Sequence, residues 1–150
     1  MTVLGAIRPD EWNWALLLHV GGAMILVGAV LTATSALVLA RGDARLLRLG
    51  YFSLLAVGLP GWAMTFAGAT WIADKEGFTG DNDPTWVGIG WGVGTFGGLL
   101  LLISLIVGGI GTYRLRGGKG TVLLKVTMGI SLVLLAGFTV TIWAMAGKPS

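Results

Sequence analysis

The chain has 150 residues, of which 55% are hydrophobic and only 11% are charged. An ordinary soluble domain carries about 25% charged residues, so this composition argues against a soluble globular protein. The net charge is +3, but the basic residues stand in short segments beside apolar stretches and form no patch, so no nucleic-acid partner is expected. The chain has no cysteine, which excludes disulfides, thiolate metal ligands and thiol catalysis.

Four stretches of the chain contain no Asp, Glu, Lys or Arg: Trp12 to Ala40, Leu49 to Ala73, Pro84 to Tyr113 and Val126 to Gly147. Each is long enough to cross a bilayer, which takes about 20 apolar residues. In lipid such a segment must be helical, because its backbone polar groups have to be satisfied internally. We therefore predict an all-α integral membrane four-helix bundle, a single transmembrane domain over residues 1–150 with spans at about 12–40, 49–73, 85–113 and 122–147. The first span is too long for a signal-peptide core, so we expect it to be retained.

The first span contains His19, the only histidine of the chain, seven residues from its start. At about 1.5 Å per residue this is about 10 Å deep, and ionisable groups at such depth face protein or a water-filled cavity. On a helical wheel His19 falls at the edge of a small-residue face, so we expect it to point toward a neighbouring helix. The small face holds Ala15, Gly22, Ala29, Ala33 and Ala36 with Gly28 and Thr32, and the lipid-facing stripe holds Leu16, Val20, Val27, Leu31 and Val38.

The second span carries Met64, the side chain that we expect opposite His19. Met64 shares a face with Gly61 and lies only slightly deeper than His19. A histidine and a thioether suit copper(I) or an axial pair on haem iron, so His19 and Met64 are the candidate cofactor ligands and His19 the candidate metal ligand. Two alternatives are open: a neutral His19 hydrogen-bonded to a hydroxyl or backbone carbonyl of another helix, and a proton or quinone role. Candidate hydroxyls come from Thr65, Thr95, Thr139 and Thr141.

Pro60 lies inside the same span and has no backbone N–H. We expect it to kink the helix about one turn earlier.

The connections alternate in the sign of their charge. The first has three arginines against Asp43, the third has Arg114, Arg116, Lys119 and Lys125 without an acid, and the second, residues 74–84, has four acids against Lys75. The positive-inside rule places the first and third connections in the cytoplasm, and both termini with the acidic connection outside. Most tryptophans fall at predicted outer ends and both tyrosines at inner ends. We expect a multi-pass protein of the inner, plasma membrane, with the lipid bilayer as its surroundings.

Small residues recur four apart along each span, and this spacing is typical of close helix packing. The candidate packing residues are Gly28 with Thr32, Gly61 with Thr65, Gly90 with Gly94 and Gly98, and Gly137 with Thr141. In the third span the glycines exceed one stripe: Gly88, Gly90, Gly92, Gly94, Gly97 and Gly98. We therefore expect this helix to contact both its own bundle and a second chain, either a copy of itself or part of a larger membrane complex.

A displacement of 76 positions aligns Gly21-Gly22 with Gly97-Gly98, and Leu59 to Thr65 with Leu135 to Thr141. Two hairpins of the same orientation, related by an axis along the membrane normal, would give this pattern. Chance similarity between helices rich in leucine and glycine is the other interpretation.

The first span reads Leu17-Leu18-His19 and then Gly28, which resembles the opening helix of several bacterial membrane families. These include the copper-resistance D type and the four-helix protoporphyrinogen oxidase. The chain resembles most the four-helix family called domain of unknown function 2269, also in Leu59-Pro60-Gly61 with Gly68, and in Trp143-Ala144-Met145 with Lys148-Pro149. The resemblance implies a bacterial inner-membrane protein with haem or copper at His19. With one histidine and no Arg or Lys in the interior of a span, bis-histidine haem ligation within one chain is out of reach, and we do not expect the oxidase activity to transfer.

Two classes of function follow from these observations. The first is a non-catalytic subunit or assembly factor of a membrane complex, indicated by the glycine-rich faces, short connections and lack of a polar intramembrane cluster. The second is a haem- or copper-binding protein that uses His19. Transport is a third class, for neutral substrates only, because the interiors of the spans hold no Asp, Glu, Lys or Arg to couple ions.

Overall fold

The computed structural model describes residues 13–78, 80 and 83–147, which form four long helical segments. The first joins α1 (Asn13–Leu16), a π-helical turn η3 (Leu17–Gly21) and α2 (Gly22–Leu39). The second joins α3 (Ala44–Ser53), a second π-helical turn η4 (Leu54–Gly58) and α4 (Leu59–Glu76). The third is α5 (Thr85–Arg114) with the 3₁₀ turn η5 (Leu115–Gly117), and the fourth is α6 (Thr121–Gly147).

Each of the four segments is long and apolar enough to cross a membrane. They run over Asn13–Leu39, Ala44–Glu76, Thr85–Gly117 and Thr121–Gly147, with mean hydropathies between 1.4 and 2.2. The predicted number of helical segments is confirmed. The second segment begins earlier than the predicted 49, because Asp43 caps α3 by accepting a hydrogen bond from the backbone N–H of Arg45 at 2.8 Å.

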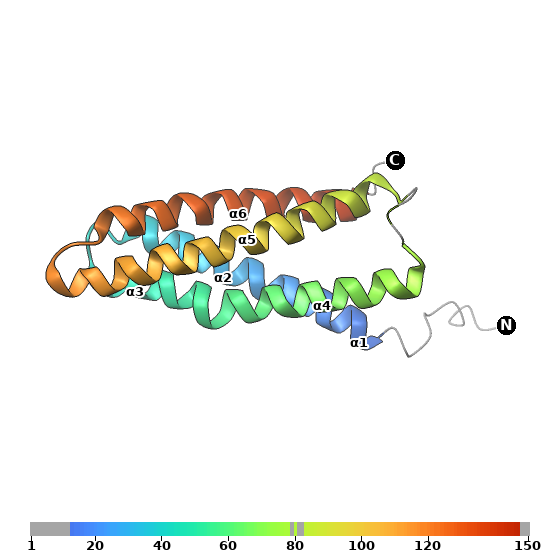
Figure 1. Ribbon diagram of the computed structural model, residues 1–150, viewed down its shortest axis with the longest axis horizontal. Coiled ribbons are helices and arrows are strands. Elements are labelled where there is room, and N and C mark those ends of the chain that lie inside the picture. The colour runs from blue at the N-terminus through green and yellow to red at the C-terminus, as the bar shows by residue number, and fades with distance from the viewer. Residues whose placement is uncertain (1–12, 79, 81–82, 148–150) are drawn as a thin grey trace.

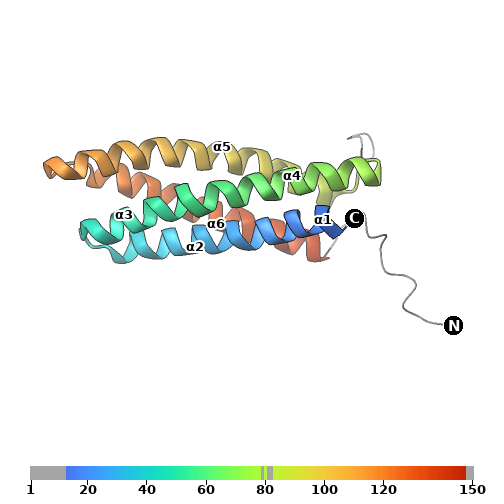
Figure 2. The ribbon, with the colours of Figure 1, turned by 90° about the horizontal axis from the view of Figure 1, so that it is seen from below.

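The four segments lie roughly parallel in one elongated bundle, with connections at its two ends (Figures 1 and 2). The first segment packs on α3 and α4 and also on α6, while α5 packs chiefly on α6. Contacts between α4 and α5 are sparse, and these two helices diverge toward the end where residues 77–84 connect them (Figure 1). The first described residues of α1 and the last of α6 lie at this same end.

The core lies at mid-height, where aliphatic side chains from all four segments meet. Leu54 and Leu101 are fully buried there, and Phe138 closes the core toward the α4–α5 end. The outer surface is also apolar, with large side chains such as Met24, Phe96 and Ile106 mostly exposed. An exposed apolar mantle around a packed core is what a bilayer solvates, since no backbone polar group of a helix needs water.

The helix that contains Pro60 has the π-helical turn η4 at the position where the sequence predicts a kink. Within η4 the N–H of Leu59 bonds to the carbonyl of Leu54, five residues back instead of four. Since Pro60 has no N–H to donate, the widened turn absorbs the missing bond. A left-handed Gly77, at φ 74°, ends α4.

The glycines aligned by the 76-residue displacement do not make equivalent contacts. Gly22 packs against the backbone of Thr65 within the first hairpin, whereas Gly98 packs against the indole of Trp62 across the two hairpins. An internal repeat therefore stays a prediction from the sequence.

Candidate functional site

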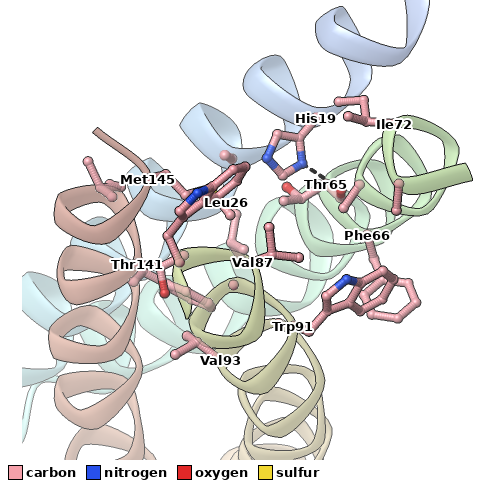
Figure 3. A pocket seen from close by; sticks show the side chains of 18 of the residues that line it. His19, Leu26, Thr65, Phe66, Ile72, Val87, Trp91, Val93, Thr141 and Met145 are labelled. Atoms are coloured by element: carbon pink, nitrogen blue, oxygen red, sulfur yellow. Dashed lines mark hydrogen bonds between the residues drawn. The ribbon is translucent and has the colours of Figure 1, made fainter. Parts of the chain in front are cut away.

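A cavity of about 420 Å³ lies between the two hairpins, where α4 and α5 diverge. All four helical segments contribute to its wall, including Leu26 of α2, Phe66 of α4, Val87 of α5 and Thr141 of α6 (Figure 3). The wall is mostly apolar, and the volume falls in the range of small-molecule sites. The cavity is at the end of the bundle that carries the acidic connection, with Glu76 at its margin.

His19 contributes its ring to this cavity from the π-helical turn η3. Its Nδ1 lies 3.0 Å from the backbone carbonyl oxygen of Thr65 on α4 (Figure 3). Because a carbonyl only accepts, Nδ1 carries the hydrogen, and in the neutral ring Nε2 is then an acceptor. The predicted interhelical contact of His19 is confirmed, with a backbone carbonyl as its partner.

Three glycines bring the first segment close enough to α4 for this bond. A Cβ at Gly68 would collide with the backbone N of His19, a Cβ at Gly61 would lie 2.8 Å from the N of Leu26, and one at Gly22 would lie 2.5 Å from the N of Thr65. No side chain fits at these positions without separating the helices. The glycines thus fix the depth and direction of the imidazole.

An aromatic wall links α4 to α5 across the cavity. The rings of Trp62 and Phe66 stack with centroids 5.4 Å apart, and Phe66 meets Trp91 edge-on at 5.5 Å. Trp62 also donates its Nε1 hydrogen to the carbonyl of Gly94 at 2.9 Å. Aromatic stacking and this bond join the hairpins where their backbones separate. Sequence reasoning missed this wall, because it treated tryptophans only as markers of the membrane interface.

Most polar groups of the wall already have partners. Thr65 Oγ1 donates to Gly61 O at 2.7 Å, and Thr141 Oγ1 donates to Gly137 O at 3.0 Å. The Nε1 hydrogen of Trp91 forms no hydrogen bond within the part of the chain that the structure describes. The cavity therefore presents one ring acceptor, His19 Nε2, and one ring donor, Trp91 Nε1.

Met64 and His19 do not meet in the cavity. Met64 is not part of the wall, and its Cβ lies over Gly22. The methionine that does line the cavity is Met145 of α6, on the wall away from His19 (Figure 3). Of the candidate hydroxyls, Thr65 and Thr141 line the cavity, whereas Thr95 and Thr139 are exposed.

The remaining packing residues divide between buried and open positions. Gly61 and Gly98 are buried against Leu26 and Trp62, and Gly90 lies beside the methyl group of Met145. Gly94 and Gly137 have looser neighbours, at 3.9 Å and 3.5 Å from an added Cβ. Gly28 and Thr32 are exposed and pack no other helix of this chain, so a packing role for them stays a prediction about a second chain.

The donor set of the cavity does not fit copper or haem. Among the described residues no three His, Asp or Glu side chains gather in one place. The cavity wall has two imidazole or thioether donors, the Nε2 of His19 and the sulfur of Met145, and they come from different sides of the cavity. Copper(I) and an axially paired haem need their donors to converge on one ion.

No protein family, no curated protein sequence and no solved structure matches this chain. The resemblance to the four-helix family therefore stays a prediction. The described fold is all-helical, and its four helical segments, each long and apolar enough to span a membrane, suggest a multi-pass membrane protein.

Proposed function

We propose that this chain is a non-catalytic membrane subunit that binds a flat, apolar small molecule of quinol or phenol type in the cavity between its hairpins. The observation that carries the proposal is the convergence of an aromatic wall and a positioned imidazole on one cavity of about 420 Å³. Sites of this size that are apolar with a few fixed polar groups are typical of small-molecule binding between helices.

The polar groups select the ligand's chemistry. His19 Nε2 accepts a hydrogen bond, so it favours a hydroxyl on the ligand, and Trp91 Nε1 favours an acceptor oxygen. Stacking on Phe66 and Trp62 favours a planar ring. A ring that carries a hydroxyl and a second oxygen, as in quinols, meets these three demands together.

Quenching of tryptophan fluorescence tests the proposal. The full chain in lipid nanodiscs is titrated with a short-chain benzoquinol, and two variants follow. His19→Phe removes the acceptor and is expected to weaken binding about tenfold, as loss of one well-placed hydrogen bond to a ring nitrogen predicts. Gly94→Leu fills the cavity, because an added Cβ there meets only Phe66 at 3.9 Å, and is expected to abolish saturable quenching.

Gly129→Leu serves as the matched control, because Gly129 is exposed on α6 and an added Cβ meets nothing within 4 Å. Equal quenching in Gly94→Leu and Gly129→Leu contradicts a ligand in this cavity. A Soret band or stoichiometric copper in the purified wild-type protein, lost in His19→Phe, favours the haem or copper alternative instead.

The setting that we propose is the inner membrane of a bacterium, with the acidic connection and both termini outside. The cavity then opens at the outer leaflet. Association with a copy of itself or with a larger complex is part of the proposal. It is supported by Gly88 and Gly92 of α5, where an added Cβ would meet nothing within 4 Å.

A further inference from the structure

A second cavity of about 410 Å³ lies at the opposite end of the bundle, where the basic residues gather. It is formed by the end of α2, the α2–α3 connection, Leu47 of α3 and the first two turns of α6. It shares no residue with the aromatic cavity. Nothing in the proposed function uses it.

Two cations line this cavity, Arg41 from the connection and Lys125 from α6. Neither forms an ion pair within the part of the chain that the structure describes. The one acid of the neighbouring connection, Asp43, uses its carboxylate to cap α3. Among the described residues, no carboxylate therefore forms an ion pair with either cation of the cavity.

The backbone adds to this positive character. Leu124 N donates to Gly120 O at 3.2 Å, so the N–H groups of the three preceding residues of α6 have no acceptor within the helix. Thr121, the first of them, lines the cavity. An anion at this point is favoured by both the free N–H groups and the helix dipole.

Arg41 is also held in an unusual conformation. Its φ of 41° is the one positive value among described residues other than glycine. The Asp43 N–H donates to Ala40 O at 2.5 Å across the same tight turn. Glycine would adopt this turn more readily, so an arginine here indicates a use for its side chain.

The floor of the cavity is apolar. Leu37 and Leu124 are buried, Met128 is half-buried, and Val38 is 51% exposed on the outer face of α2. The cavity thus continues onto a surface that the bilayer covers. A small inorganic anion would leave this floor uncovered, whereas an amphipathic anion covers it.

We propose that this cavity binds one anionic phospholipid. The phosphate lies between Arg41, Lys125 and the first turn of α6, and an acyl chain runs over Val38 and Met128. Clustered Lys and Arg beside a span attract anionic headgroups, and the apolar floor adds the area of a buried chain.

Native mass spectrometry of the full chain, released from nanodiscs of mixed phosphatidylglycerol and phosphatidylcholine, measures the retained lipid. One phosphatidylglycerol per chain is expected in the wild type. The double variant Arg41→Gln, Lys125→Gln is expected to lower its retention about tenfold or more. Arg116→Gln with Lys119→Gln removes the same charge from the same end, but neither residue lines the cavity, and a change below about twofold is expected there.

A further variant distinguishes loss of the lipid site from loss of the fold. Arg41→Gly relieves the positive φ, so the melting temperature should hold or rise while lipid retention falls. Equal losses in the two double variants would mean that surface charge alone holds the lipid, and would overturn the site. Inorganic phosphate that binds as tightly as the lipid, in a titration of the detergent-solubilised protein, would overturn the assignment to a phospholipid.

Discussion

The imidazole of His19 donates its Nδ1 hydrogen to the backbone carbonyl of Thr65, 3.0 Å away on the neighbouring helical segment. The two residues are 46 positions apart in the chain. The bond fixes the tautomer of the neutral ring and leaves Nε2 toward the cavity.

His19→Gln separates two roles of the side chain, the structural hydrogen bond to Thr65 and the proposed acceptance of a hydrogen bond from a ligand. The glutamine amide can still donate to the Thr65 carbonyl, so the free energy of unfolding should fall by less than about 0.6 kcal/mol, the average of an interhelical hydrogen bond in a membrane. Benzoquinol binding should nevertheless weaken, because the amide oxygen of glutamine, although it accepts hydrogen bonds, does not occupy the position of the imidazole Nε2. Unfolding in mixed micelles with sodium dodecyl sulfate, and the quenching titration, measure the two effects. A large loss of stability with unchanged binding contradicts this division of roles.

Gly61→Ala should destabilise the bundle by about 1–3 kcal/mol, as overpacking of a close contact does. An added Cβ would lie 2.8 Å from the backbone N of Leu26, which cannot move without shifting the helix. Gly28→Ala is the matched control on the facing segment, where nothing lies within 4 Å. Its stability should be unchanged or slightly higher, because alanine favours the helix. The same micelle unfolding assay compares the two, and equal stability would contradict the close approach at Gly61.

The sequence was sufficient to predict the four helical segments, because each contains an uninterrupted apolar run that is flanked by charged residues. The missing N–H of Pro60 also predicted the position of an irregularity, though as a kink and not as the π-helical turn that the structure has. The π-helical turn η3, around His19, has no such signal in the sequence, because no proline follows it.

The wheel of the first span predicted a direction for His19 but could not identify the acceptor, because every helix presents carbonyls of the same kind. The expectation of Met64 opposite His19 has a related limit, because the methionine that lines the cavity is Met145 of α6. Depth along a span is readable from the sequence, whereas the angle at which two hairpins diverge is not. The cavity depends on that angle, and on Trp62 reaching Gly94 across it.

Ser104→Ala should raise the free energy of unfolding by up to about 1 kcal/mol. The Ser104 side chain is fully buried in the centre of α5, and its hydroxyl has no partner among the described residues. Removing an unsatisfied buried hydroxyl relieves its desolvation cost. Ser131→Ala is the comparison, since that equally buried hydroxyl donates to Thr127 O at 2.9 Å and its loss should destabilise. Destabilisation of both variants alike would indicate an unseen partner for Ser104.

Gly88→Leu with Gly92→Leu should reduce self-association while leaving monomer stability unchanged. Both glycines face away from the bundle, and an added Cβ at either meets nothing within 4 Å. The sequence alone had suggested Gly90 and Gly94 for this test, but these two face Met145 and Phe66 of the same chain. Crosslinking in native membranes and native mass spectrometry measure association, with Gly129→Leu as control. Monomeric wild-type protein in both measurements would refute the predicted interface.

Reporter fusions should place the basic end of the bundle in the cytoplasm. The first and third connections hold seven Lys and Arg against Asp43, and the second holds Lys75 against four acids. Since the positive-inside rule counts Lys and Arg near the ends of the spans, the orientation follows from this difference. Fusions after Gly42 and Gly118 should report the cytoplasm, and fusions after Gly80 and Ser150 the exterior. The reverse pattern would move the aromatic cavity to the inner leaflet and the Arg41–Lys125 cavity to the outer one, where anionic lipid is scarcer. It would therefore weigh against the phospholipid site as well as the orientation.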